Sequence, residues 1–274
     1  MKERFEQSNE SGETNEFKNN KRNFFINLGL RARENLKMHK EAGLWQRNEG
    51  KRDWGNVSEH CLVEAARAEI FAEKLGLSQS KKRDLVSGAI LHDFDKRRQI
   101  ELFNEEGITW SNYQKSEEDA QKLLEKAGFN KQIIRLVGSI GLISLEDIEK
   151  VLSKEKLSQE DITVLVLHYI DDYTSGSDWA KPSEINQEGK KINDVNKRMG
   201  KVGERYKELG KEGVEFFGFK DSSIFDAEIR IGHVIEKRLA EMINQKNNSN
   251  IEPEDLPEFI DNEIRNKIES SRYE

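Results

Sequence analysis

Apolar residues recur at intervals of three and four positions along most of this chain. That spacing places them on one face of an α-helix, so it predicts a succession of amphipathic helices. The sequence shows no internal repeat. The expected helices cover residues 24–45, 56–76, 78–96, 116–127, 130–140, 144–152, 162–173, 188–210, 222–245 and 255–271.

Polar and turn-rich segments divide the chain into three parts. Residues 1–22 lack apolar periodicity and are rich in Glu, Ser, Asn and Lys, so they are predicted to form a disordered tail. Residues 23–180 are expected to form the main helical domain, within which residues 99–115 form a loop. Residues 181–274 are expected to be a helical extension that either pads the main domain or forms a small accessory bundle.

Composition favours an all-α fold. The 274 residues are enough for one large domain or two small ones, and only three of them are proline. Good helix formers dominate the remainder. Hydrophobic residues and charged residues each make up 35% of the chain, which predicts a small core beneath a heavily solvated surface.

Charge and cysteine content argue against several classes of protein. The formal net charge of −7 is unusual for a general binder of nucleic acid or acidic membranes, since such proteins are normally basic. A single cysteine makes no internal disulfide, which is typical of a reducing cytosol. No apolar run reaches the length of a membrane span or a signal-peptide core. We therefore expect a cytoplasmic protein.

The adjacent residues His92 and Asp93, in the run GAILHDFDKRR, have the clearest potential for chemistry. His60 stands earlier, at the start of an Ala-rich amphipathic stretch, and Asp171 directly follows the apolar run ITVLVLHYI. All four are expected on helices. Two imidazoles and two carboxylates form a ligand set for one divalent metal ion and leave coordination positions for water and substrate.

Taken singly, each of these residues is more often a surface group or a hydrogen-bonded core group than a metal ligand. Their joint pattern favours a metal site, because it combines chain order, apolar context and helical placement. A metal at such a site neutralises an anionic phosphate ester and lowers the pKa of a bound water towards neutrality.

The order His60, His92-Asp93, Asp171 resembles the H…HD…D signature of the HD-domain superfamily of metal-dependent phosphohydrolases. The resemblance covers roughly residues 50–180. It implies an all-helical domain that hydrolyses phosphoester bonds, commonly in nucleotides, with these four residues as metal ligands. Asp172 is the alternative for the last ligand. Asp171 is preferred because it continues the face of the preceding apolar helix.

The chain departs from the sequence patterns of several known HD branches, and these departures count against membership of those branches. Between the His-Asp pair and Asp171 the chain has one histidine, His168. Members with two metals carry extra histidines in this interval, so a single metal is expected. The chain has no Gly-Tyr-Pro motif, which counts against the cyclic-di-GMP branch. Lys96-Arg97 stands where stringent-response hydrolases carry Glu-Asp. Lys96 also stands where nucleoside 5′-monophosphatases usually carry Glu, which leaves the catalytic acid or base open.

The sequence allows two interpretations of Lys96. It either contacts a substrate phosphate or is a solvated surface lysine. His168 is expected to be a hydrogen-bonded core histidine rather than a ligand, and His39 is expected to have no role in the site.

The sequence as a whole predicts an HD-type metal-dependent phosphohydrolase in which metal-bound water attacks phosphorus. Its expected cofactor is one divalent ion among Mn, Fe, Co, Ni, Zn and Mg. Its expected substrate is a nucleotide or another small phosphate ester, with no nucleic-acid or membrane partner. The alternative is a non-catalytic HD-fold module that binds a ligand or a protein.

Overall fold

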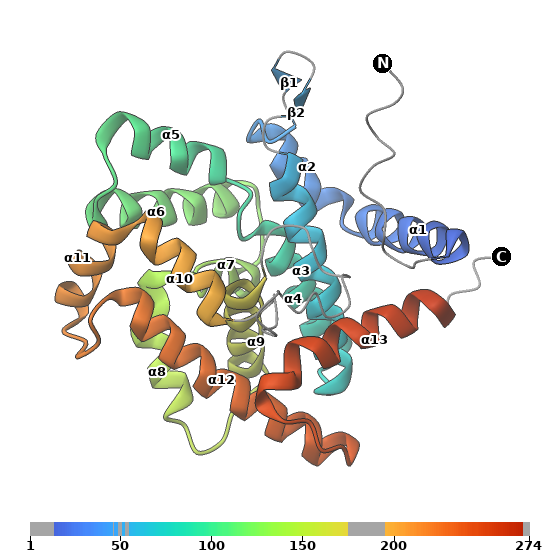
Figure 1. Cartoon of the computed structure of the whole chain (residues 1–274). Coiled ribbons are helices and arrows are strands. Elements are labelled where there is room, and N and C mark those ends of the chain that lie inside the picture. Colours follow the sequence, from blue (N-terminus) through green and yellow to red (C-terminus); the bar gives the residue numbers. More distant parts are fainter. Residues whose placement is uncertain (1–13, 46, 49–50, 53–54, 175–194, 271–274) are drawn as a thin grey trace.

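The computed structural model describes residues 14–45, 47–48, 51–52, 55–174 and 195–270, and these form an all-α fold, as predicted (Figure 1). Besides the helices there is one short antiparallel hairpin, β1 paired with β2. No described helix is both long and apolar enough to cross a membrane. The elements are α1 (Asn15–Arg31), α2 (Arg33–Glu41), β1 (Arg47–Asn48), β2 (Lys51–Arg52), α3 (Gly55–Lys74), α4 (Gln79–Leu91), α5 (Lys96–Glu106), α6 (Trp110–Lys126), α7 (Lys131–Val137), η1 (Leu142–Ser144), α8 (Leu145–Leu152), α9 (Gln159–Tyr173), α10 (Val195–Arg205), α11 (Lys207–Phe217), α12 (Ile224–Asn247), η2 (Pro253–Asp255) and α13 (Leu256–Ser270).

The N-terminal part of the chain is more ordered than predicted. The expectation of a tail over residues 1–22 is wrong from Asn15 onward, where α1 begins. Thr14 caps this helix, because its side chain accepts a hydrogen bond from the backbone N–H of Phe17. Phe17 and Phe24 are buried on one side of α1, and this burial offsets the polar composition that suggested disorder. The single helix expected over residues 24–45 is two helices, with the junction at Ala32.

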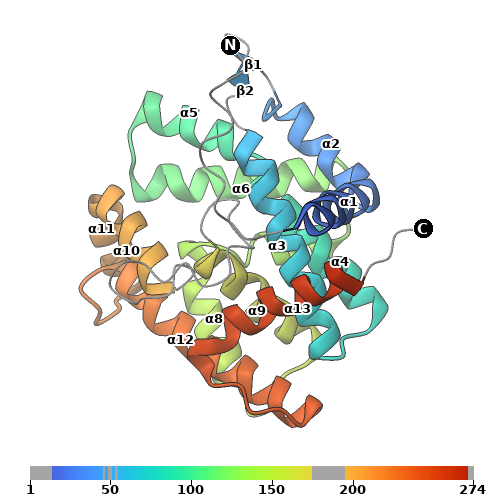
Figure 2. The ribbon, with the colours of Figure 1, turned by 45° about the vertical axis from the view of Figure 1, so that its right-hand side comes forward.

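Three helices, α3, α4 and α9, lie at the centre of the molecule and pack against one another (Figures 1 and 2). The Ala-rich sequence of α3 keeps its buried face thin and allows the neighbouring helices to approach closely. Gly88 does the same for α4, since a Cβ at this position would lie 2.9 Å from Cδ2 of Leu167 on α9. This close packing brings together the helices on which His60, His92 and Asp171 were predicted.

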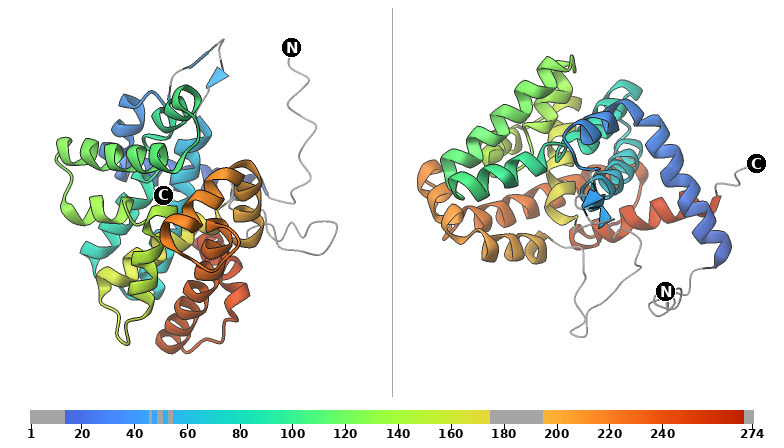
Figure 3. Two further views of the ribbon diagram at one scale, coloured as in Figure 1. Left: turned by 90° about the vertical axis from the view of Figure 1, so that its left-hand side faces the viewer. Right: turned by 90° about the horizontal axis from the view of Figure 1, so that it is seen from above.

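The chain around His92 turns where one continuous helix was predicted. Ser78 caps α4, but α4 ends at Leu91 and α5 begins at Lys96. The loop predicted over residues 99–115 is also wrong, because most of it belongs to α5 and α6, which pack side by side (Figure 3). Thr109 caps α6 and Trp110 is buried at its first turn, so tertiary packing decides this segment.

The C-terminal helices pad the main domain. One continuous set of buried apolar side chains extends from Phe17 on α1 to Ile268 on α13. Helix α12 packs against α9 and α10, and α13 packs across α3 and α1 (Figure 2). The helix expected over residues 188–210 begins at Val195 among the described residues and is followed by the separate α11.

Candidate metal centre

His60 and Glu64 lie one turn apart on α3 and face the same space. Nε2 of His60 is 3.0 Å from Oε1 of Glu64, and both side chains are buried. The donor groups beside its two oxygens are the imidazole nitrogens of His60 and His92, at 3.0 and 3.3 Å. A fully buried carboxylate is costly unless a cation or hydrogen bonds compensate it. Glu64 therefore has the chemistry of a metal ligand, although the sequence analysis did not single it out.

His92, at the C-terminal end of α4, presents a free ring nitrogen to the same space. Its Nδ1 is 2.9 Å from the carbonyl oxygen of Ala89 and 3.3 Å from Oε2 of Glu64. Both of these atoms are acceptors, so in the neutral ring Nδ1 carries the proton and Nε2 keeps its lone pair. That Nε2 is buried and has no hydrogen-bond partner within the described part of the chain. Metal-binding histidines are commonly oriented in this way by a hydrogen bond from their other nitrogen.

Asp171, near the end of α9, completes the group. Its Oδ1 lies 3.7 Å from Nε2 of His60 and 3.5 Å from Nε2 of His92. Burial by itself would raise the pKa of Asp171, but Arg198 and the two histidines hold it well below its usual range. Asp172, the alternative left open by the sequence, points instead towards His168.

The four side chains can converge on one ion. The donor atoms of His60, Glu64, His92 and Asp171 all lie within 4.8 Å of one another. Two donors that share a metal at about 2.0–2.2 Å are roughly 3–4 Å apart, so modest side-chain movement would bring the set to bonding distance. Two imidazoles with two carboxylates suit Mn, Fe, Co, Ni or Zn.

Electrostatics in this space favour a cation. Burial alone lowers the pKa of His60, yet Glu64 and Asp171 raise it to about 10. The carboxylates thus attract positive charge strongly enough to keep a proton on a fully buried imidazole. A dication bound by the same carboxylates would displace that proton, since only neutral imidazole binds a metal.

Asp93, also predicted as a ligand, lies at the edge of this group. Its Oδ2 is 3.7 Å from Nε2 of His92, and its Oδ1 is 3.3 Å from Nζ of Lys96. Burial raises the pKa of Asp93, but Lys96 and His92 lower it to about 2. The role of Asp93 as a metal ligand stays a prediction.

Lys96 is the first residue of α5 rather than a continuation of α4. Burial lowers the pKa of Lys96, but Asp93 and Asp171 outweigh it, so the pKa is raised and the ammonium stays charged. A second cation comes from Arg198 on α10, whose Nη2 is 2.8 Å from Oδ1 of Asp171. Its Nη1 is buried and has no hydrogen-bond partner among the residues described. No pattern in the sequence pointed to Arg198, because only tertiary packing brings α10 to this place.

Comparisons with protein-family models, with curated proteins and with solved structures find no match for this chain.

His39 connects the helices that carry the two histidines, although it was predicted to have no role. Its Nε2 donates to the carbonyl of Ile90 on α4, at 2.6 Å, so its Nδ1 accepts from the hydroxyl of Ser58 on α3, at 3.0 Å. Nε1 of Trp45 in turn donates to the same hydroxyl at 2.9 Å. Burial lowers the pKa of His39 to about 4, which keeps the ring neutral.

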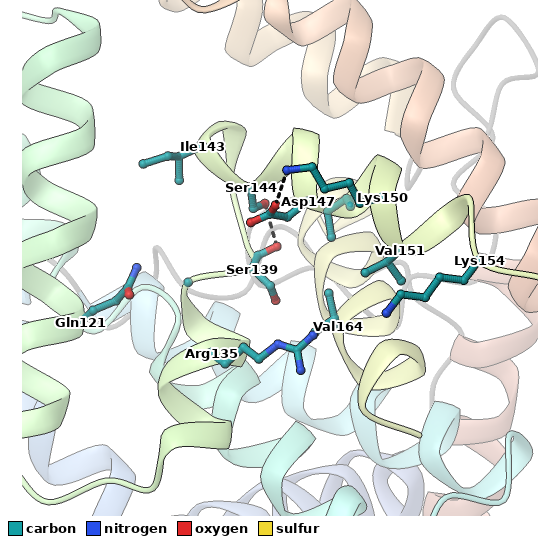
Figure 4. A pocket seen from close by; sticks show the side chains of 12 residues that line it. Gln121, Arg135, Ser139, Ile143, Ser144, Asp147, Lys150, Val151, Lys154 and Val164 are labelled. Atoms are coloured by element: carbon teal, nitrogen blue, oxygen red, sulfur yellow. Dashed lines mark hydrogen bonds and ion pairs between the residues drawn. The ribbon is translucent and has the colours of Figure 1, made fainter. Parts of the chain in front are cut away.

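A pocket of about 470 Å³ lies elsewhere, over α7, α8 and α9 (Figure 4). None of the four converging residues lines it. Its cations are paired with acids: Lys150 with Asp147 at 3.1 Å, and Lys154 and Arg135 with Asp161 at 2.7 and 4.0 Å. Because its cations are already paired with acids of the chain, this pocket carries no chemical assignment.

Proposed function

We propose that this protein is an HD-type metal-dependent phosphohydrolase that acts on a nucleotide or another small phosphate ester. The observation that carries the proposal is the group of buried His60 and Glu64 and half-buried His92 and Asp171, flanked by the cations Lys96 and Arg198. The resemblance to the HD superfamily supports it from the sequence side. Three central helices supply the group, and rigid elements hold ligands more accurately than loops do.

The four residues would hold one divalent ion. When bound, that ion would neutralise the phosphate ester and provide hydroxide near neutral pH. The carboxylates of Glu64 and Asp171 balance its charge, and the hydrogen bond from Nδ1 of His92 to Ala89 keeps the free nitrogen aimed inward. A neutral complex of this kind is far easier to bury than either the carboxylates or the ion alone.

The two flanking cations suit an anionic substrate. Arg198 uses Nη2 to hold Asp171, which leaves Nη1 as a second donor for a phosphoryl oxygen. Lys96 holds Asp93 in the same way and offers an ammonium to the phosphate. Both side chains therefore position an acid and recognise an anion at once.

Glu117 on α6 is the best candidate for the acid that protonates the leaving group. Burial raises its pKa to about 7, with Lys96 acting in the opposite direction. Nε2 of Gln99 donates to its Oε1 at 3.0 Å and orients the carboxyl. A catalytic acid works best when its pKa is close to the operating pH. Glu117 would thus fill the acid role that the sequence left open.

The deciding experiment is a screen of phosphate release. The metal-free full chain is reloaded separately with Mn²⁺, Fe²⁺, Co²⁺, Ni²⁺, Zn²⁺ and Mg²⁺ and offered nucleoside mono-, di- and triphosphates and sugar phosphates. Turnover should require a metal and should disappear in His60→Gln. The exposed variant Glu118→Gln on α6 serves as the matched control. Metal-dependent release that persisted in His60→Gln would overturn the proposal.

One observation favours the alternative, a non-catalytic HD-fold module. Arg198 already gives Asp171 a cationic partner at 2.8 Å, as a purely structural ion pair would. If Arg198 replaces the metal in this way, the purified chain would hold no metal at the four residues. Elemental analysis of wild type and His60→Gln separates the two cases, because only the enzyme loses metal on this substitution.

A further inference from the structure

A second group of convergent polar side chains includes Asp172, the residue that follows Asp171 in α9. His168 and Asp172 are one turn apart on this helix, and Glu228 approaches them from α12. All three are buried, with exposed fractions of 0%, 1% and 2%. Their donor atoms lie within 4.8 Å of one another, and Nε2 of His168 is 3.6 Å from Oδ2 of Asp172.

The imidazole of His168 is oriented like that of a metal ligand. Its Nδ1 donates to the carbonyl of Ser139 at 2.9 Å, and the same carbonyl accepts from the hydroxyl of Ser144 at 2.9 Å. In the neutral ring, Nε2 therefore keeps its lone pair. In the described part of the chain, this Nε2 and Oδ2 of Asp172 are buried without a hydrogen-bond partner. The sequence correctly predicted a hydrogen-bonded core histidine, but one ring nitrogen remains available.

We propose that His168, Asp172 and Glu228 form a second metal site, which binds a divalent transition-metal ion such as Zn²⁺ or Mn²⁺. One neutral imidazole and two carboxylates carry a charge of about −2, which a dication cancels. The site shares no ligand with the first one, so it does not depend on what the first site binds. It departs from the single metal that the sequence predicted.

The packing of α12 against α9 and α10 brings Glu228 close to Asp172. Gly232 stands one turn after Glu228, and a Cβ at Gly232 would lie 3.4 Å from Oδ2 of Asp172 and 2.9 Å from Cγ1 of Val195. A side chain here would separate α12 from α9 and α10. The glycine therefore lets Glu228 reach Asp172, and a metal between them would lock the C-terminal helices to the helix that carries Asp171.

The competing explanation is a carboxyl pair that shares protons. Burial raises the pKa of Asp172 and of Glu228 well above the usual range, so the metal-free pair holds protons. A proton-sharing pair and a metal site make different predictions for metal stoichiometry. In the first case, Glu228→Gln preserves the neutral pair and the metal content does not change.

The test is elemental analysis of the full chain after saturation with Zn²⁺ or Mn²⁺ and removal of unbound ion. Wild type should retain two equivalents, Glu228→Gln one, and Glu64→Gln one. The exposed Glu241→Gln on α12 should retain two. His168→Gln provides a second variant if Glu228→Gln does not fold, with circular dichroism as the check on folding.

The outcomes separate this inference from the proposed function. If Glu228→Gln and His168→Gln keep the wild-type metal content, the second site is overturned and the first is unaffected. If Glu64→Gln keeps the wild-type content while Glu228→Gln loses one equivalent, the second site stands and the metal assignment behind the proposed function fails.

Discussion

At the scale of single residues, Glu64 shows how strongly the surroundings of a carboxylate define its chemistry. It is fully buried in an Ala-rich helix, one turn from His60, and its two oxygens face the imidazoles of His60 and His92 at 3.0 and 3.3 Å. A core position that tolerates such a group without a cation would be unusual.

We predict that Glu64→Gln weakens metal binding by at least the tenfold to hundredfold that loss of an outer hydrogen-bond partner costs. The amide keeps the shape of the side chain but removes its charge. Titration of the metal-free protein with Zn²⁺ or Mn²⁺ measures the change at the first site. Glu59→Gln, exposed on the same helix, should bind metal like wild type. Equal affinity in Glu64→Gln and wild type would remove Glu64 from the ligand set.

We predict that Lys96→Ala lowers kcat/KM for the best phosphate ester by about ten- to hundredfold and leaves metal content unchanged. A charged hydrogen bond to a phosphate is typically worth about 1.5–3 kcal/mol. Steady-state kinetics and elemental analysis measure the two quantities. Arg98→Ala, an exposed cation in the same turn, is the matched control. Wild-type kinetics in Lys96→Ala would make this lysine a surface group.

We predict that the activity declines as pH rises above about 7, because Glu117 must be protonated to act as an acid. Burial raises the pKa of this carboxyl to about 7. Glu117→Gln should lower kcat and abolish the decline, which a kcat profile between pH 5.5 and about 9 will reveal. An unchanged profile in this variant would assign the acid role to another group.

At the scale of elements, the relay through His39 joins α2 to the two helices that carry His60 and His92. The ring lies between the hydroxyl of Ser58 and the carbonyl of Ile90. Because the ring is buried and neutral, it links α3 and α4 without adding charge next to the candidate metal site.

This relay predicts a loss of stability in acid. Burial lowers the pKa of His39 to about 4 in the fold, whereas the unfolded chain keeps an ordinary value near 6.5. Between these values only the unfolded chain binds the proton, so stability falls as pH is lowered from 6.5 towards 4. The contribution of His39 is about 2–3 kcal/mol over this range.

Urea unfolding of wild type and His39→Gln at pH 7 and pH 4.5 measures this contribution. It is the change in unfolding free energy between the two pH values in wild type minus the same change in the variant. The variant lacks the titrating ring, so its stability should fall less between the two conditions. Other titrating groups cancel in the comparison. An identical loss in both proteins would contradict the buried, neutral state of His39.

At the scale of the whole molecule, Arg67 on α3 connects helices that are far apart in the sequence. Its side chain is fully buried, and its Nε and Nη2 donate to both carboxylate oxygens of Asp261 on α13 at 2.9 and 2.8 Å. Its Nη1 donates to Thr174 at the end of α9, at 2.6 Å. One guanidinium thus connects α3, α9 and α13, and α3 and α9 carry residues of the candidate metal site.

We predict that Asp261→Ala lowers the free energy of unfolding by about 3–5 kcal/mol, because it leaves a buried guanidinium without its partner. The double variant Arg67→Met with Asp261→Leu should recover much of this loss, since it removes both charges. Urea unfolding measures both values. A loss of less than about 1 kcal/mol in Asp261→Ala would show that the pair behaves as an exposed one.

Local patterns were sufficient for part of the site. Helical spacing and apolar context identified His60, His92 and Asp171 as residues on helix faces, and the structure brings these three together. The same reasoning failed between His92 and Lys96, because hydrophobic periodicity does not reveal a one-turn break. Helical spacing and apolar context also failed to identify Glu64, because in the sequence it is an isolated polar residue in an apolar run.

The sequence by itself determined the all-α class, most of the helices and the faces on which the histidines lie, because these properties depend on neighbours three and four positions away. The helix face also favoured Asp171 over Asp172, and the structure places Asp171 beside the two histidines. Only the tertiary structure brought Arg198 to Asp171 and Glu228 to His168. These contacts depend on how α10 and α12 pack against α9, and no local pattern encodes that packing.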